Sequence, residues 1–173
     1  MAQSVELLLD ERAEAAVRRQ WNLLADAGLP SERRATPSEH HRPHVTLFAA
    51  DTVPVEAEAA LPEIVAGLDL EIQVGSLLLF GPRRGRVILV RAITPNRALL
   101  EFQERIADAC GAPPDGQFGP GRWSPHVTLA RRVPVVQIGE VLAALDGTAD
   151  QPVIARIESC RRWDGDRKAA WLL

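Results

Sequence analysis

The sequence PHVTL at residues 43–47 recurs unchanged at residues 125–129. The histidines of the two copies, His44 and His126, are 126 − 44 = 82 residues apart, and other short stretches match at the same spacing. Among them are LADA at 24–27 with IADA at 106–109, and V-x-L at 5–7 with V-x-L at 87–89. Self-similarity at a fixed spacing indicates a duplicated structural unit. We therefore expect two equivalent strands, each beginning with a histidine.

Polar and apolar side chains alternate within each copy of this motif. Successive side chains of a β-strand point to opposite faces, so His44 and Thr46 share one face, as do His126 and Thr128. The valine and leucine of each copy then share the other face, where they can pack beneath a helix. If the two strands face each other, two imidazoles and two hydroxyls line one groove.

Hydrophobic periodicity predicts the remaining elements. Apolar residues three to four apart indicate helices, and short apolar or alternating runs indicate strands. We expect helices at 10–27, 55–66, 95–110 and 135–145, strands at 4–9, 44–49, 70–80, 86–93, 126–131, 153–163 and 167–173, and loops at 31–43 and 111–123. The turn GPRRG at 81–85 joins two of these strands into a hairpin, which predicts mainly antiparallel pairing.

The order of the predicted elements repeats once along the chain. Strand, helix, loop, strand, helix and strand occur twice, and a last strand repeats the first. We expect one α+β domain over residues 1–173, with two pseudo-symmetric lobes, an internal repeat at 1–82 and 83–164, and a closing strand at 167–173. A chain of 173 residues is long enough to bury a core of its own.

The net charge and the composition limit which classes of partner the protein is expected to bind. The formal net charge of −3 argues against a protein that coats long nucleic acids, although it leaves room for a small cyclic nucleotide or one RNA end. Every apolar run is far too short to cross a bilayer, so we expect no membrane association. Two cysteines without metal-type spacing, Cys110 and Cys160, are expected to be buried thiols in a cytoplasmic protein. We expect a monomer.

Two imidazoles and two hydroxyls in one groove suit phosphodiester chemistry. A neutral imidazole can deprotonate water or a hydroxyl, and a protonated one can donate to the leaving oxygen. Threonine hydroxyls can donate to the non-bridging phosphate oxygens. Two strand histidines lack an obvious third protein ligand for catalytic zinc, so we expect neither metal nor cofactor. The alternative, that each histidine merely begins a strand after proline, leaves the repeat of both His and Thr unexplained.

The paired motifs HVTL at 44–47 and HVTL at 126–129 resemble those of the 2H phosphoesterase superfamily, in particular its 2′-5′ RNA ligase-like (LigT-like) branch. The resemblance extends over essentially the whole chain. It implies a bilobal fold with two mainly antiparallel sheets around a central cleft and helices outside. It also implies metal-independent hydrolysis of 2′,3′-cyclic phosphates at RNA ends or on nucleotides, with His44, Thr46, His126 and Thr128 as catalytic residues.

Four further residues are candidates for substrate binding. Arg131 follows the second motif, where an arginine is common in the family, and could hold a phosphate oxygen. Strict alternation places Arg131 opposite His126 and Thr128, so this role requires a bend or a long reach. Trp123 and Phe118 could stack on a base or, equally, pin their loop to the body. Arg122 could attract an anionic substrate or simply be exposed.

The resulting hypothesis is a cyclic phosphodiesterase in which, by analogy with the family, His44 is the acid and His126 activates water. A second enzyme hypothesis is a 2′-5′ RNA ligase, or its reverse, using the same residues. A third hypothesis from a different class is a catalytically idle module that binds RNA ends or nucleotides. Product analysis separates the first two hypotheses, and turnover separates both from the third.

Overall fold

The computed structural model describes residues 3–36, 38–149 and 151–173. Its elements in chain order are β1 (Gln3–Leu9), α1 (Glu11–Asp26), β2 (His44–Ala50), α2 (Val55–Val65), β3 (Glu71–Arg83), β4 (Arg86–Thr94), α3 (Arg97–Ala109), β5 (His126–Pro134), the short 3-10 helix η1 (Val135–Gln137), α4 (Ile138–Ala144), β6 (Val153–Asp164) and β7 (Ala169–Leu172). The predicted helices and strands are confirmed with ends that differ by a few residues: the helix expected at 135–145 begins as a 3-10 turn, and the turn expected at 81–85 is shorter because β3 continues to Arg83. Met1, where the predicted domain begins, and Pro37 of the predicted loop lie outside the described residues.

The described strands form one seven-stranded sheet in the order β2-β1-β6-β3-β4-β5, with β7 on β6. Every pairing is antiparallel, as the hairpin turn predicted. The two predicted sheets are joined by the long strand β6. Its first residues pair with β3, and the rest of the strand pairs with β1 and β7. The chain is therefore α+β, with two groups of strands that share one member.

The register at the centre of the sheet has an internal symmetry. Glu71 lies opposite Arg156, and Val74 lies opposite Val153. A shift of 82 residues converts 71 into 153 and 74 into 156, so it exchanges these two pairs. Two units related by a two-fold axis between β3 and β6 would produce this register. The observation supports the predicted repeat, and the division of the chain at residue 82 remains a prediction.

The two helices that follow β1 and β4 start on matching caps. Asp10 accepts a hydrogen bond from the backbone of Ala13 at 2.8 Å, and Asn96 accepts one from Leu99 at the same distance. Side-chain caps of this kind satisfy otherwise unpaired N–H groups of the first turn. Each helix then buries one apolar stripe, which includes Trp21 and Leu24 in α1 and Phe102 and Ile106 in α3. Both stripes pack against the sheet.

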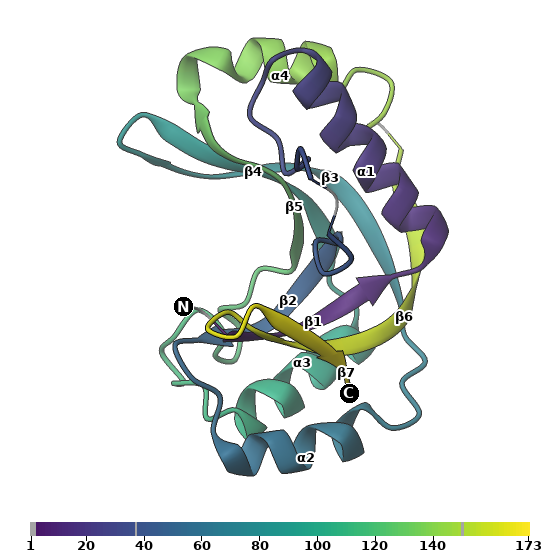
Figure 1. The fold of residues 1–173 in the computed structure, drawn as a ribbon, viewed down its shortest axis with the longest axis vertical. Coiled ribbons are helices and arrows are strands. Elements are labelled where there is room, and N and C mark those ends of the chain that lie inside the picture. Colours follow the sequence, from purple (N-terminus) through teal and green to yellow (C-terminus); the bar gives the residue numbers. More distant parts are fainter. Residues whose placement is uncertain (1–2, 37, 150) are drawn as a thin grey trace.

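Helices α1 and α3 each contact a strand from the other half of the sequence. In Figure 1, α1 lies beside α4 at one end of the molecule, and α3 lies beside α2 at the other. Helix α1 contacts β5, which belongs to the second repeat, and α3 contacts β2, which belongs to the first. Each end of the molecule is therefore built from both halves of the sequence. Neither half has its complete helical cover without the other.

The two ends of the strand order come together in space. Strands β2 and β5 stand at opposite ends of the hydrogen-bonded order, yet they lie in contact with each other. The sheet is therefore curved, and its curvature is visible in Figure 1. This contact brings the two histidine-bearing strands side by side.

Cys110 and Cys160 are buried free thiols, as predicted. Burial raises the pKa of Cys110 to about 11 and that of Cys160 to about 12, so both remain protonated at neutral pH. Within the described part of the chain, no helix is long and apolar enough to span a bilayer.

Candidate active site

His44 and His126 are the first residues of β2 and β5, and both rings are held in the same way. Nδ1 of His44 lies 2.8 Å from the carbonyl oxygen of Arg42, and Nδ1 of His126 lies 2.7 Å from that of Ser124. A carbonyl oxygen can only accept, so Nδ1 is the donor in each ring. Each Nε2 therefore faces away from the backbone and is the nitrogen that can exchange a proton with a substrate.

Two tryptophans connect the histidine strands to the opposite halves of the chain. Nε1 of Trp21 donates to the carbonyl oxygen of Thr128, and Nε1 of Trp123 donates to that of Thr46, both at 3.0 Å. Trp21 belongs to the first half of the sequence and Thr128 to the second, whereas the other pair has the reverse relation. The two bonds fix the middle of each motif against an element from the other half.

His44 lies beside a buried carboxylate. Its Nε2 is 3.6 Å from Oε1 of Glu6, which is 5% exposed. Glu6 lies directly between Thr46 of β2 and Arg161 of β6 in the strand register, so these three side chains share one face of the sheet. Despite the opposing effect of burial, the charges of His44 and Arg161 and the hydrogen bonds from Ser4 and Arg161 lower the pKa of Glu6. An ionised carboxylate therefore faces His44 at neutral pH.

His126 has an apolar neighbour instead. Phe80 of β3 contacts its ring edge to face, with the ring centroids 4.8 Å apart. Burial is the main cause of a lowered pKa for His126, and the positive charges of His44 and Arg131 lower it further, against the hydrogen bond to Ser124. At neutral pH this imidazole is therefore in its neutral, proton-accepting form.

Arg131 is brought to the same side as Thr128 by an irregularity in β5. Leu129 and Ala130 are both buried, which breaks the alternation of the strand. The register with β4 shifts at this point, as expected of a β-bulge with one extra residue in β5. Arg131 and Thr128 consequently line one small hollow together with His44, His41, Glu32 and Trp21. The bend that a role for Arg131 requires is thus present.

The aromatic candidates in the loop before β5 point toward the body of the protein. Phe118 packs against Phe48 with the ring centroids 5.6 Å apart, and Trp123 is held by its bond to Thr46. Both are partly buried against the core, in the arrangement expected of residues that pin the loop. Arg122 is exposed. A role of these three residues in substrate binding remains a prediction.

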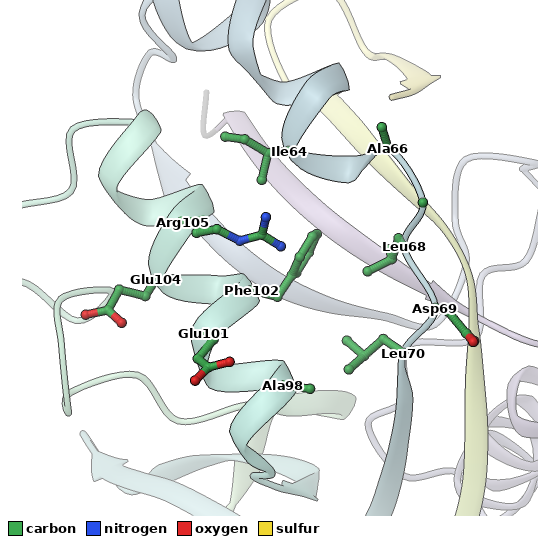
Figure 2. Close-up of a pocket in the computed structure, with 11 residues that line it drawn as sticks. Ile64, Ala66, Leu68, Asp69, Leu70, Ala98, Glu101, Phe102, Glu104 and Arg105 are labelled. Atoms are coloured by element: carbon green, nitrogen blue, oxygen red, sulfur yellow. The ribbon is translucent and has the colours of Figure 1, made fainter.

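A larger cavity lies away from the histidines. Its volume is about 560 Å³, and it lies between α3 and the segment that leads from α2 into β3. Figure 2 shows Phe102 and Arg105 of α3 facing Ile64, Leu68 and Leu70 across it. No histidine or threonine lines this cavity among the described residues. The predicted catalytic residues therefore lie outside this cavity, and two of them, His44 and Thr128, line the small hollow.

Two neighbours of the histidines were not predicted from the sequence. Glu6 and Phe80 lie on β1 and β3, 38 and 46 residues away from the histidines they face. Neither belongs to a motif, and no local pattern marks them as site residues. A prediction of the strand pairing would have placed Glu6 opposite Thr46. Within residues 3–36, 38–149 and 151–173, no group of three or more His, Cys, Asp or Glu side chains could hold a metal ion.

Solved structures similar to this chain share its fold at low sequence identity. TT0787 of Thermus thermophilus is 16% identical, with a TM-score of 0.58 over 100% of this chain and 95% of that one. E. coli LigT complexed with 3′-AMP is 13% identical, with a TM-score of 0.54 over 99% and 92%. Usb1 of Kluyveromyces marxianus is 11% identical, with a TM-score of 0.58 over 99% and 97%. At these identities the likeness establishes the fold alone.

The family follows from the sequence match. No curated protein matches the chain by sequence. The model of the 2′-5′ RNA ligase superfamily, however, matches residues 10–168, a span that includes both histidine strands. Members of this family are phosphoesterases and ligases. With the LigT-like fold and the paired motifs, this match shows that the chain belongs to the 2′-5′ RNA ligase superfamily of two-histidine phosphoesterases.

Proposed function

We propose that this protein hydrolyses 2′,3′-cyclic phosphates at RNA ends or on nucleotides by metal-independent acid–base catalysis. The observation that carries the proposal is the unlike surroundings of two similarly held imidazoles. His126 is kept neutral by burial, whereas His44 faces the ionised carboxylate of Glu6. Two titratable groups whose surroundings differ in this way are suited to the roles of base and acid.

In the proposed reaction, Nε2 of His126 takes a proton from a water molecule as the water oxygen bonds to phosphorus. The bond from phosphorus to one ribose oxygen breaks, and Nε2 of His44 donates its proton to that oxygen. The product is a ribose phosphate monoester with one free hydroxyl. The protons return to their starting positions through solvent, so each histidine is ready for the next cycle. General acid–base catalysis of this kind contributes about 10²–10⁴-fold per group.

The remaining groups would bind the phosphate and the nucleoside. Thr46 and Thr128 lie on the same strand faces as the histidines and would donate their hydroxyls to non-bridging oxygens. Arg131 is 3.5 Å from Glu32 and is largely exposed, so it is free to turn toward a phosphate oxygen. The structure of E. coli LigT with 3′-AMP supports a nucleotide as the ligand class. Trp123, Arg122 and Phe118 would contribute at the edge of this site.

Phosphorus NMR of the EDTA-treated protein with 2′,3′-cyclic nucleotides tests the proposal. We expect conversion to one monophosphate isomer, lost in both His44→Ala and His126→Ala. Turnover that survives both substitutions would contradict the proposed site. Binding of the nucleotide without turnover would instead support an idle binding module, and a product with a new 2′-5′ linkage from RNA fragments would support the ligase hypothesis.

A further inference from the structure

Glu6 occupies an unusual place for a carboxylate. It lies in the middle of β1, a strand paired on both sides, and its neighbours in the register are Thr46 and Arg161. Strand interiors of this kind are normally apolar, and a buried charge is costly unless it is paired and hydrogen-bonded. The surroundings of Glu6 meet that condition, since each of its oxygens has a partner.

The partners of Glu6 fix each oxygen separately. Arg161, itself 5% exposed, binds Oε2 through Nε at 2.8 Å and Nη2 at 2.7 Å. Ser4 donates its hydroxyl to Oε1 at 2.6 Å. Oε1 is therefore held at 3.6 Å from Nε2 of His44, beyond hydrogen-bond distance. The carboxylate attracts a charged imidazole without taking the proton that Nε2 would donate to a substrate.

Other charged groups also act on this pair. His126 of β5 interacts electrostatically with His44, and so does His41, which lies in the loop before β2. Arg42 supplies the carbonyl that accepts from Nδ1 of His44, while its guanidinium is bound by Glu14 and Glu158. The charge of Glu6 also helps to raise the pKa of the buried thiol of Cys160. Among these neighbours, the carboxylate that lies within 4 Å of a ring nitrogen of His44 is that of Glu6.

We propose that Glu6 is a positioning residue, which holds His44 as the proton donor by facing its Nε2 with a fixed negative charge. Ser4 and Arg161 support this role because their hydrogen bonds hold the two carboxylate oxygens of Glu6 in place. The inference rests on the proposed acid–base function of His44, and it adds a fifth side chain to the two histidines and two threonines. The residue 82 positions later is Ile88, and the residue opposite Thr128 in the strand register is Val90, so no carboxylate holds the corresponding place in the second motif.

The test is Glu6→Gln, which removes the charge and keeps the shape. We expect the alkaline limb of the kcat–pH profile to move to lower pH by about one unit, because the acid loses its counter-charge. KM should change little. Glu6→Asp keeps the charge one bond farther away, and a smaller shift in the same direction is expected. This second variant decides the matter if Glu6→Gln does not fold.

Glu58→Gln is the matched control. Glu58 binds the neighbouring buried arginine, Arg162, at 2.8 Å, so its loss also disturbs an ion pair of β6. No shift of the alkaline limb is expected in this variant. An equal shift in Glu58→Gln, or an unmoved limb in folded Glu6→Gln and Glu6→Asp, would overturn the proposal.

A measurement without substrate separates this inference from the proposed function. Nitrogen NMR of the His44 imidazole follows its protonation in the full-length protein. We expect the ring to stay protonated to higher pH in the wild type than in Glu6→Gln. If the wild type proves inactive on cyclic phosphates while this difference is present, the proposed function fails and the Glu6–His44 coupling stands. Coincident titrations would refute the coupling itself.

Discussion

The backbone holds the rings of the two histidines in the same way, but the neighbours of the rings differ in chemistry. Near His44, Glu6 of β1 lies opposite Arg161 of β6, and both are buried and charged. Near His126, the neighbour is the ring of Phe80 from β3, and Thr128 lies opposite the apolar Val90 of β4. The hydrogen bonds of the two rings are alike, but the strand register differs, because His44 lies opposite Leu8 and His126 lies opposite Ala92. The repeat therefore holds two imidazoles in the same way, one beside an ionised carboxylate and the other beside an apolar ring.

Under the proposed function, this difference would let two copies of one unit perform opposite tasks. A charge near an imidazole favours the form of opposite charge, and an apolar wall favours the neutral form. In the proposed function, the unlike neighbours of the two rings would separate acid from base. The predictions below test the difference between the two histidine neighbourhoods, from the largest expected effect to the smallest.

The largest effect is expected from removing either imidazole. His44→Ala and His126→Ala should each lower kcat by about 10²–10⁴-fold, because acid and base act in the same transition state. The pH profiles should differ: His44→Ala loses the alkaline limb, and His126→Ala loses the acid limb. Steady-state kinetics with a cyclic nucleotide measure both. His40→Ala is the control, because the side chain of His40 is partly exposed in the loop before β2. A variant that keeps near-full activity would remove its histidine from the mechanism.

The charged pair should dominate stability. Glu6→Leu leaves Arg161 buried without its carboxylate, so the free energy of unfolding should fall by about 3–5 kcal/mol at pH 7. Ile88→Ala, 82 residues later in the sequence, should cost about 1 kcal/mol or less because Ile88 is 38% exposed. Urea unfolding measures both values. Equal costs would contradict the larger contribution expected of the buried ion pair of Glu6 and Arg161.

The pH dependence of that stability has a defined sign. The pKa of Glu6 is lowered in the folded protein from its ordinary value of 4.5. Its contribution is therefore fully present above pH 4.5 and is lost as the pH falls through the folded-state value. The difference between the wild type and Glu6→Leu should consequently shrink in acid. A difference that stays constant down to low pH would contradict the ionised state assigned to Glu6.

The scaffold, in contrast, should respond alike in both halves. Trp21→Phe and Trp123→Phe each remove an indole N–H that is 3.0 Å from a threonine carbonyl. Each should cost about 1–3 kcal/mol in unfolding free energy, because a largely buried carbonyl loses its donor. Trp171→Phe at the exposed edge strand is the control and should change stability little. Unequal losses for the two central tryptophans would extend the difference between the halves to the scaffold.

The smallest effect should appear at Phe80. Phe80→Ala admits water to His126, whose pKa is lowered mainly by burial, so that pKa should rise toward its ordinary value. The acid limb of the kcat/KM profile should then move to higher pH by about half a unit. Leu79→Ala, on the opposite face of β3, is the control. A limb that does not move would show that other groups exclude water from His126.

Several features followed from the sequence because they depend on local periodicity. The helices and strands, the shared face of His and Thr in each motif, and the antiparallel hairpin all arise from neighbours within a few residues. The role considered for Arg131 required one more feature, the bulge at Ala130, which changes the face of the strand. A bulge of this kind depends on the partner strand. Strict alternation of side chains along β5 therefore predicts the wrong face for Arg131.

The sequence by itself determined which side chains are paired by the repeat and which chemistry they can perform. Tertiary structure alone decided that β2 and β5 meet, that α1 and α3 exchange places, and that Glu6 faces His44 while Phe80 faces His126. The physical reason is the range of the contacts involved. Glu6 and Arg161 are 155 residues apart in the sequence, and only the register of strands paired across that distance brings them beside His44.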